Sequence, residues 1–110
     1  MTGRSRDKFT YRVTWSEDDG EYVGLCAEFT SLSWLAASQE AALKGIRKTV
    51  REIVANMKEV GEDVPEPLST KRFSGRFVVR VPEDIHRRLA ISAAEKGISL
   101  NRLVSAKLSR

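Results

Sequence analysis

The chain has only one cysteine and one histidine among its 110 residues, so it lacks the side chains that form disulfides and structural metal sites. A disulfide needs two cysteines, and a zinc site needs about four Cys or His ligands, so both are excluded. No apolar run approaches the ~18 residues of a membrane span. Residues 1–8 are polar, without the pattern of a secretion signal, and are expected to form a short flexible lead. We therefore expect a cytoplasmic protein with no metal and no membrane partner, in which Cys26 is unpaired.

Catalytic groups are equally scarce. A nuclease of the ribonuclease-H type needs several carboxylates that converge on metal ions, one of them in its first strand, and residues 9–15 contain no acid. His86 is expected on the polar side of a helix, and Cys26 among apolar neighbours is more typical of a small buried group than of a nucleophile. There is no glycine-rich phosphate loop. We predict that the chain is not an enzyme, has no catalytic residue and needs no cofactor.

Charge is plentiful and unevenly divided. Residues 71–110 carry ten Lys or Arg against three acids, a balance of +7. Residues 1–70 carry nine against twelve, a balance of −3. A basic half favours a polyanionic partner such as nucleic acid, whereas an acidic half favours a different partner.

Within the basic half, residues 75–82 have the alternation of a β-strand. One face carries Phe77, Val79 and Val81. The other face carries Arg76, Val78 and Arg80. Proline at position 82 ends the strand, because it has no N–H to donate and holds the preceding residue in an extended conformation.

Two helices are expected after this strand. Pro82 suits the first position of a helix, Gly97 suits its left-handed cap, and Ser99 can cap the second helix. Apolar side chains recur at helical spacing along both segments. A strand and two helices in about 35 residues are too few to fold alone, since chains below ~40 residues usually need a metal, disulfides or a partner.

Two copies would solve this problem by pairing their strands antiparallel and intertwining their helices. The paired strands would satisfy each other's backbone groups. The ribbon would present its arginine face outward, and the major groove, ~12 Å wide, admits such a ribbon. The predicted dimer core consists of Phe77, Val79, Val81, Ile85, Leu89, Leu103 and Val104.

The run from Gly75 to Leu108 resembles a ribbon-helix-helix DNA-binding domain, the β-ribbon class that includes Arc repressor. The resemblance implies that base edges of an operator are read by Arg76, Val78 and Arg80. It also implies that a DNA phosphate is held at the start of the second helix by Ser99, Leu100, Asn101 and Arg102.

The first half of the chain predicts a small α+β domain over residues 9–60. Alternation and turn residues indicate strands over 9–15, 21–27 and 31–35, and Ser38 can cap a long helix that Gly61 ends. The apolar stripe of that helix is Ala42, Ile46, Val50, Ile53, Met57 and Val60. Residues 61–74 contain two prolines and no periodicity, which predicts a linker to the tail domain at 75–110.

Three strands and a helix followed by such a tail resemble the HicB family of antitoxins. The resemblance depends on Tyr11–Trp15, Gly20–Phe29 and the helix from Ser38. It implies a truncated ribonuclease-H-type fold in front, a small basic ribonuclease toxin of the HicA type as partner, and repression of the operon by the tail. The acids expected to meet the toxin are Glu17, Asp18, Asp19, Glu21 and Glu28. Two dimers could also pair through their front domains into a tetramer.

Two alternatives stay open. The chain could be a stand-alone repressor whose front domain binds a small ligand or only drives oligomerisation. The second, more distant alternative is a metal-dependent nuclease that uses Asp18, Asp19 or Glu28.

Overall fold

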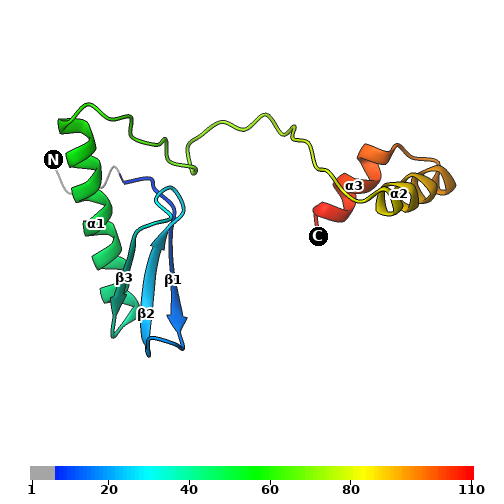
Figure 1. Cartoon of the computed structure of the whole chain (residues 1–110). Coiled ribbons are helices and arrows are strands. Elements are labelled where there is room, and N and C mark those ends of the chain that lie inside the picture. The colour runs from blue at the N-terminus through cyan, green and yellow to red at the C-terminus, as the bar shows by residue number, and fades with distance from the viewer. Residues whose placement is uncertain (1–6) are drawn as a thin grey trace. The chain divides into compact units, whose positions relative to one another are not determined.

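The computed structural model describes residues 7–110, so most of the predicted lead, residues 1–6, lies outside the described residues. The chain divides into two compact units, the first ending at Phe73 and the second running from Ser74 to Arg110. Over the described residues the protein is α+β, with one three-stranded antiparallel sheet and three helices (Figure 1). The predicted α+β class is confirmed.

The sheet of the first unit is a simple meander. β1 (Tyr11–Ser16), β2 (Glu21–Cys26) and β3 (Ser33–Ala36) pair antiparallel in that order. The β1–β2 turn closes with Gly20 at a φ of 63°, a conformation that glycine adopts without steric cost. All three predicted strands are present, with ends that differ by one or two residues.

The long helix α1 (Gln39–Glu59) covers one face of this sheet (Figure 1). Ser38 caps it as predicted, since its side chain accepts a hydrogen bond from the Ala41 N–H. Ala42, Ile46 and Val50 are fully buried, as the stripe predicts. Val60 is not: it is 61% exposed because it is the C-cap, where the helix has already ended. The helix can approach closely because β2 has Gly24 there; a Cβ at that position would lie 2.5 Å from the Ala42 carbonyl oxygen.

The first part of the predicted linker packs against the first unit. Val64, Pro65 and Pro67 are partly buried. The Leu68 N–H donates to the Glu28 carboxylate at 2.7 Å, and the Ser69 hydroxyl donates to the Lys8 carbonyl. This part of the predicted linker has no periodic pattern, and individual hydrogen bonds hold it in place.

The second unit contains α2 (Glu83–Lys96) and α3 (Leu100–Leu108). Both predicted helices are confirmed, with Gly97 as a left-handed C-cap at a φ of 69° and the Ser99 side chain accepting from the Arg102 N–H. The sequence predicted Pro82 as the first helical residue. In the structure it is the N-cap, one position earlier. The two helices bury only Ala93 and Leu103 against each other, so this unit has a very small core within one chain.

Residues 76–81, predicted as a strand, form no strand in the single chain. The Ser74 hydroxyl accepts a hydrogen bond from the Arg76 N–H and donates one to the Arg76 carbonyl. Residues 77–81 make no backbone hydrogen bond to any other described residue. A strand needs a neighbour, and this stretch has none within its own chain. Pairing between two copies stays a prediction.

Candidate nucleic-acid and partner interfaces

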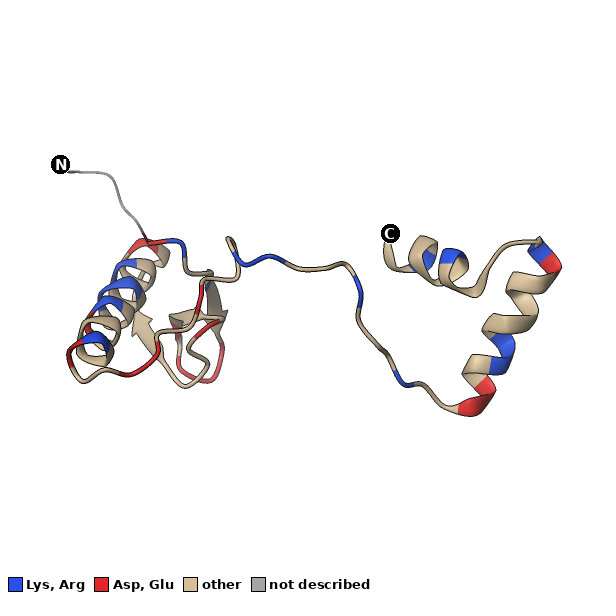
Figure 2. Ribbon diagram, turned by 90° about the horizontal axis from the view of Figure 1, so that it is seen from above, with Lys and Arg blue, Asp and Glu red and all other residues tan. Residues whose placement is uncertain are grey.

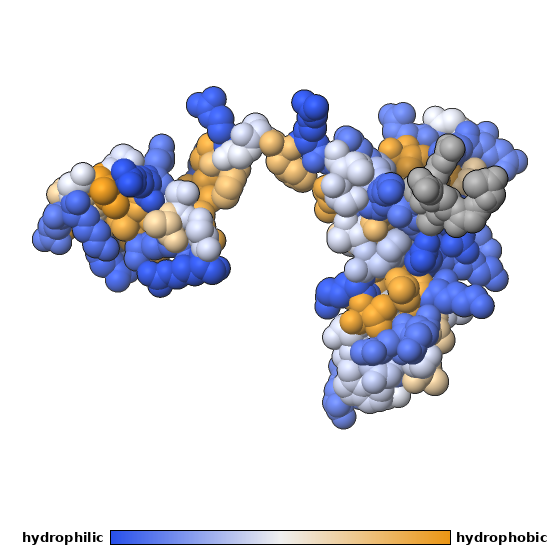
Figure 3. Space-filling model, turned by 180° about the vertical axis from the view of Figure 1, so that it is seen from behind, coloured by the Kyte–Doolittle hydropathy of each residue, from blue (hydrophilic) through white to orange (hydrophobic). Residues whose placement is uncertain are grey.

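The stretch before α2 exposes both of its faces. Val78, between the two arginines, is 88% exposed, and Arg76 and Arg80 are also exposed. The opposite row is exposed too, with Phe77 at 75%, Val79 at 63% and Val81 at 43%. Apolar residues accordingly appear on the surface of the connecting stretch in Figure 3. An exposed apolar row opposite an exposed cationic row is the surface that a paired ribbon would have to provide from each copy.

The start of α3 offers unused backbone donors. Ser99 accepts two backbone hydrogen bonds. The Arg102 N–H donates to its hydroxyl, and the Leu103 N–H donates to its carbonyl. The N–H groups of Leu100 and Asn101 have no acceptor among the described residues. Free N–H groups and the positive end of a helix dipole suit an anion such as phosphate. The four residues predicted to clamp a phosphate therefore lie together at one helix start.

Further cations of the second unit lie on its helices. The first turn of α2 contains the acids Glu83 and Asp84, and Figure 2 shows basic residues farther along that helix. Arg88 pairs with Asp84 at 3.6 Å, but both side chains are well exposed, so this ion pair adds little stability.

Of the five acids predicted to meet a toxin, the structure brings four together. Glu17, Asp18 and Asp19 lie in the β1–β2 turn and Glu21 begins β2. Two of them are held by neighbours, since the Trp15 indole donates to Glu17 at 2.9 Å and the Ser16 hydroxyl donates to Asp19 at 2.7 Å. These four acids form what we call the acidic turn.

Glu28 is not part of the acidic turn, because it lies beyond the opposite end of β2. Its carboxylate accepts hydrogen bonds from the Thr10 N–H at 3.0 Å, the Thr10 hydroxyl at 3.0 Å and the Leu68 N–H at 2.7 Å. Burial alone would raise the pKa of Glu28, but the bonds from Leu68 and Thr10 outweigh it and hold the pKa at about 2. The sequence indicated no partner for Glu28 within the chain, whereas in the structure its carboxylate joins segments 18 and 40 residues away.

Sequence reasoning also missed Asp7, which fastens the start of the described chain. It accepts from the Tyr11 hydroxyl at 2.6 Å and from the Phe9 N–H at 3.1 Å, and it lies 3.6 Å from the Arg47 guanidinium on α1. Burial, together with the hydrogen bond to Asp7, raises the pKa of Tyr11. No periodicity marks such a residue, because its partners lie both in the neighbouring residues Phe9 and Tyr11 and on the distant helix α1.

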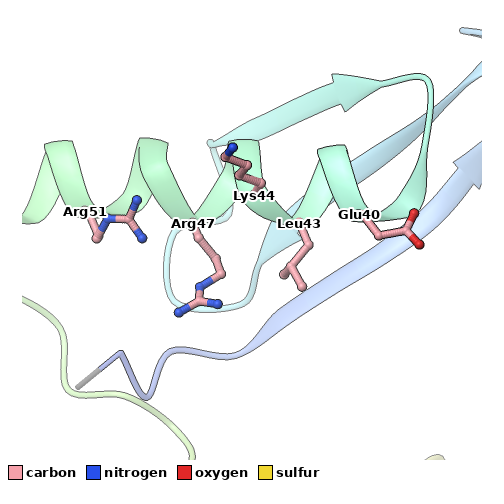
Figure 4. A pocket seen from close by; sticks show the side chains of 5 residues that line it. All are labelled: Glu40, Leu43, Lys44, Arg47 and Arg51. Atoms are coloured by element: carbon pink, nitrogen blue, oxygen red, sulfur yellow. The ribbon is translucent and has the colours of Figure 1, made fainter. Parts of the chain in front are cut away.

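An open depression of about 300 Å³ lies along α1 (Figure 4). It is lined by Glu40, Leu43, Lys44, Arg47 and Arg51, all from one helix. Among residues 7–110 no second element lines it, so these residues supply no convergent set of groups of the kind that orients a small ligand.

Within residues 7–110, no three His, Cys, Asp or Glu side chains gather so that they could hold a metal ion. None of the helices found there is both long and apolar enough to cross a lipid bilayer.

The hydrogen bonds of Glu28 predict a pH-dependent contribution to stability. Because its pKa falls from 4.5 to about 2 on folding, this contribution is complete above pH 4.5 and is lost as the pH falls through about 2. Replacing Glu28 by Gln should lower the free energy of unfolding at pH 7 and increase amide exchange at Leu68 by about three- to tenfold. Urea unfolding of both proteins at several pH values measures the first effect, and hydrogen exchange measures the second.

The matched control is Glu52→Gln, a substitution on the exposed side of α1. It should change neither quantity. A Glu28→Gln protein with unchanged Leu68 exchange and the same pH dependence as the parent would contradict this account.

One comparison with known proteins gave a match. The family model described as the HicB family matches residues 61–108, which span α2, α3, the stretch before them and the segment that follows α1. No curated protein and no solved structure matches the chain. Residues 61–108 are therefore similar to the HicB family.

Proposed function

We propose that this chain is the antitoxin of a HicAB-like toxin–antitoxin pair, a binding protein of the cytoplasm and not an enzyme. Its second unit would form a ribbon-helix-helix dimer that represses its own operon. Its first unit, a small sheet covered by one helix in the manner of a truncated ribonuclease-H fold, would bind and block a small HicA-like ribonuclease. The HicB family match over residues 61–108 supports a component of this type.

The observation that carries the proposal is the exposed apolar row Phe77, Val79 and Val81 before α2. Ile91 and Leu108 on the two helices are also more than half exposed. A unit that buries only two side chains cannot offset the conformational entropy of ordering 37 residues. A second copy would cover these side chains and supply the missing strand neighbour, which would also leave Arg76, Val78 and Arg80 facing outward.

The DNA contacts follow from this arrangement. In the major groove an arginine can bind guanine through two hydrogen bonds, and Val78 can contact a thymine methyl group but cannot hydrogen-bond. The free N–H groups at the start of α3, with Arg102 in the first turn, suit a backbone phosphate and would fix the register of the ribbon.

The acidic turn supports the toxin-binding part of the proposal. It gathers four carboxylates at one end of the sheet, and a ribonuclease that binds RNA is expected to carry a basic surface (Figure 2). The carboxylate of Glu28, unlike those of the four turn acids, is already hydrogen-bonded to Thr10 and Leu68 within the first unit.

The dimer predicts opposite effects for two neighbouring valines. Val79→Asp should weaken dimerisation at least about 100-fold, because it places a charge in the apolar interface of both copies. Val78→Asp introduces the same charge on the outward face and should leave the dimer intact while it weakens DNA binding. Analytical ultracentrifugation measures the association. A parent protein that stays monomeric at micromolar concentration with ordered helices would contradict the dimer.

Operator binding predicts a second pair of contrasting variants. Arg76→Ala or Arg80→Ala should cost ~1–3 kcal/mol for each lost guanine contact and relax specificity at that base pair. Arg102→Ala should weaken binding to all sequences alike and make the salt dependence shallower by about one for each contact. Gel shifts with the DNA upstream of the chain's own gene, at several salt concentrations, separate the two classes. If all three variants bind like the parent, the ribbon does not face DNA.

Toxin binding predicts an electrostatic effect of the acidic turn. Reversing two charges with Asp18→Lys and Asp19→Lys should slow association with a HicA-like toxin encoded beside this gene by at least about tenfold at low salt. The control is Glu52→Lys with Glu59→Lys, which changes the net charge equally on the exposed side of α1. Surface plasmon resonance measures the rate, and co-expression measures rescue of growth. Failure of the parent protein to bind the neighbouring gene product would instead favour the stand-alone repressor.

A further inference from the structure

The segment just before the ribbon carries two cations that neither the sequence prediction nor the family comparison assigns to any role. Lys71 and Arg72 are exposed, and with Arg76 and Arg80 they make four cations in a stretch that contains no acid between Glu66 and Glu83. Figure 2 shows basic residues along the connecting chain without acidic residues among them. Repulsion among these charges is unrelieved within the stretch, so an external polyanion would be bound favourably there.

The segment around these two residues has local order. The N–H groups of Thr70 and Lys71 both donate to the Pro67 carbonyl, at 3.2 and 3.0 Å. The Lys71 ammonium lies 5.8 Å above the ring of Phe73. Within this turn, the Leu68 N–H donates to the Glu28 carboxylate. An arm that is partly ordered before binding loses less conformational entropy when it binds.

Gly75 sets this arm apart from the ribbon that follows. Its φ of 80° is left-handed, outside the extended conformation of a β-strand, so the ribbon that two copies would form begins after this residue. The Ser74 hydroxyl holds the start of that stretch, because it accepts from the Arg76 N–H at 3.0 Å and donates to the Arg76 carbonyl at 3.2 Å. Cations that precede the ribbon do not lie among the base-reading residues, so the DNA groups left for them are backbone phosphates.

Chain length limits how far the arm can lie from the bases. Four residues from Arg72 to Arg76 span at most about 14 Å at ~3.4 Å each. Phosphates of one DNA strand follow each other every ~3.4 Å along the axis, so the arm reaches only about four base pairs beyond the base pair that Arg76 contacts.

We propose that Lys71 and Arg72 form a basic arm that binds DNA backbone phosphates flanking the operator, on either side of the paired ribbon. This inference rests on the proposed DNA-binding function and extends its footprint. A dimer would have two such arms, which add affinity without reading sequence.

The test compares the parent with the double variant Lys71→Ala, Arg72→Ala. Two duplexes of equal length serve as probes, one from the region upstream of the chain's own gene and one of unrelated sequence. Because a dimer loses four phosphate contacts, the slope of log K against log salt should become shallower by about 3.6. Affinity for both duplexes should fall by the same factor, so the ratio between them should not change.

The matched control is Lys48→Ala with Lys58→Ala, which removes the same charge from exposed positions of α1. Its slope should equal that of the parent. A double arm variant with the parental slope, or with a slope no shallower than that of the control, overturns the basic arm but leaves the proposed function intact. A parent protein that binds neither duplex overturns the proposed function, and the basic arm with it.

Discussion

The second unit depends on one constraint: it cannot complete a core or a sheet from its own residues. Ala93 and Leu103 are its only buried apolar side chains, while Phe77, Val79 and Val81 remain in solvent. The backbone N–H and C=O groups of residues 77–81 also lack partners, because no described segment pairs with them. The second copy that we propose would supply both the apolar burial and the backbone pairing, and the proposed sequence-specific binding would then exist only in the paired state.

The first unit is stabilised in a different way. Its helix and sheet meet closely at Gly24, where the absence of a side chain lets the Ala42 backbone approach. Around this contact, two carboxylates connect distant segments: Asp7 joins the start of β1 to α1, and Glu28 joins the same region to the segment after α1. Hydrogen bonds from neutral donors to a charged oxygen are stronger than average, which explains how so small a core keeps irregular chain in place.

Elements with a period were predictable from sequence, and single contacts were not. The stripe Ala42, Ile46, Val50 and the caps at Ser38, Gly97 and Ser99 gave the helices, because the caps and the 3.6-residue period are local properties. The exposure of Val60 was not predicted, because the helix ends one residue before it. The partners of Glu28 were missed because Leu68 is 40 residues away and contributes only its backbone N–H, which every residue except proline has. The site predictions divide in the same way: the four positions at the start of α3 lie together, whereas Glu28 separates from the acidic turn, and the two faces set by alternation in residues 76–81 stay a prediction because the single chain forms no strand there.

The bond between Glu28 and Leu68 also determines where the protein can be divided for study. A recombinant fragment that stopped at the end of α1 would contain every helix and strand of the first unit, yet it would remove the Leu68 donor and the partly buried Val64, Pro65 and Pro67. The carboxylate would lose the Leu68 hydrogen bond, so its pKa would rise toward the ordinary value and its contribution to the stability of the fragment would decrease. The smallest self-sufficient version of this unit therefore extends through Ser69, ten residues beyond the last turn of its helix.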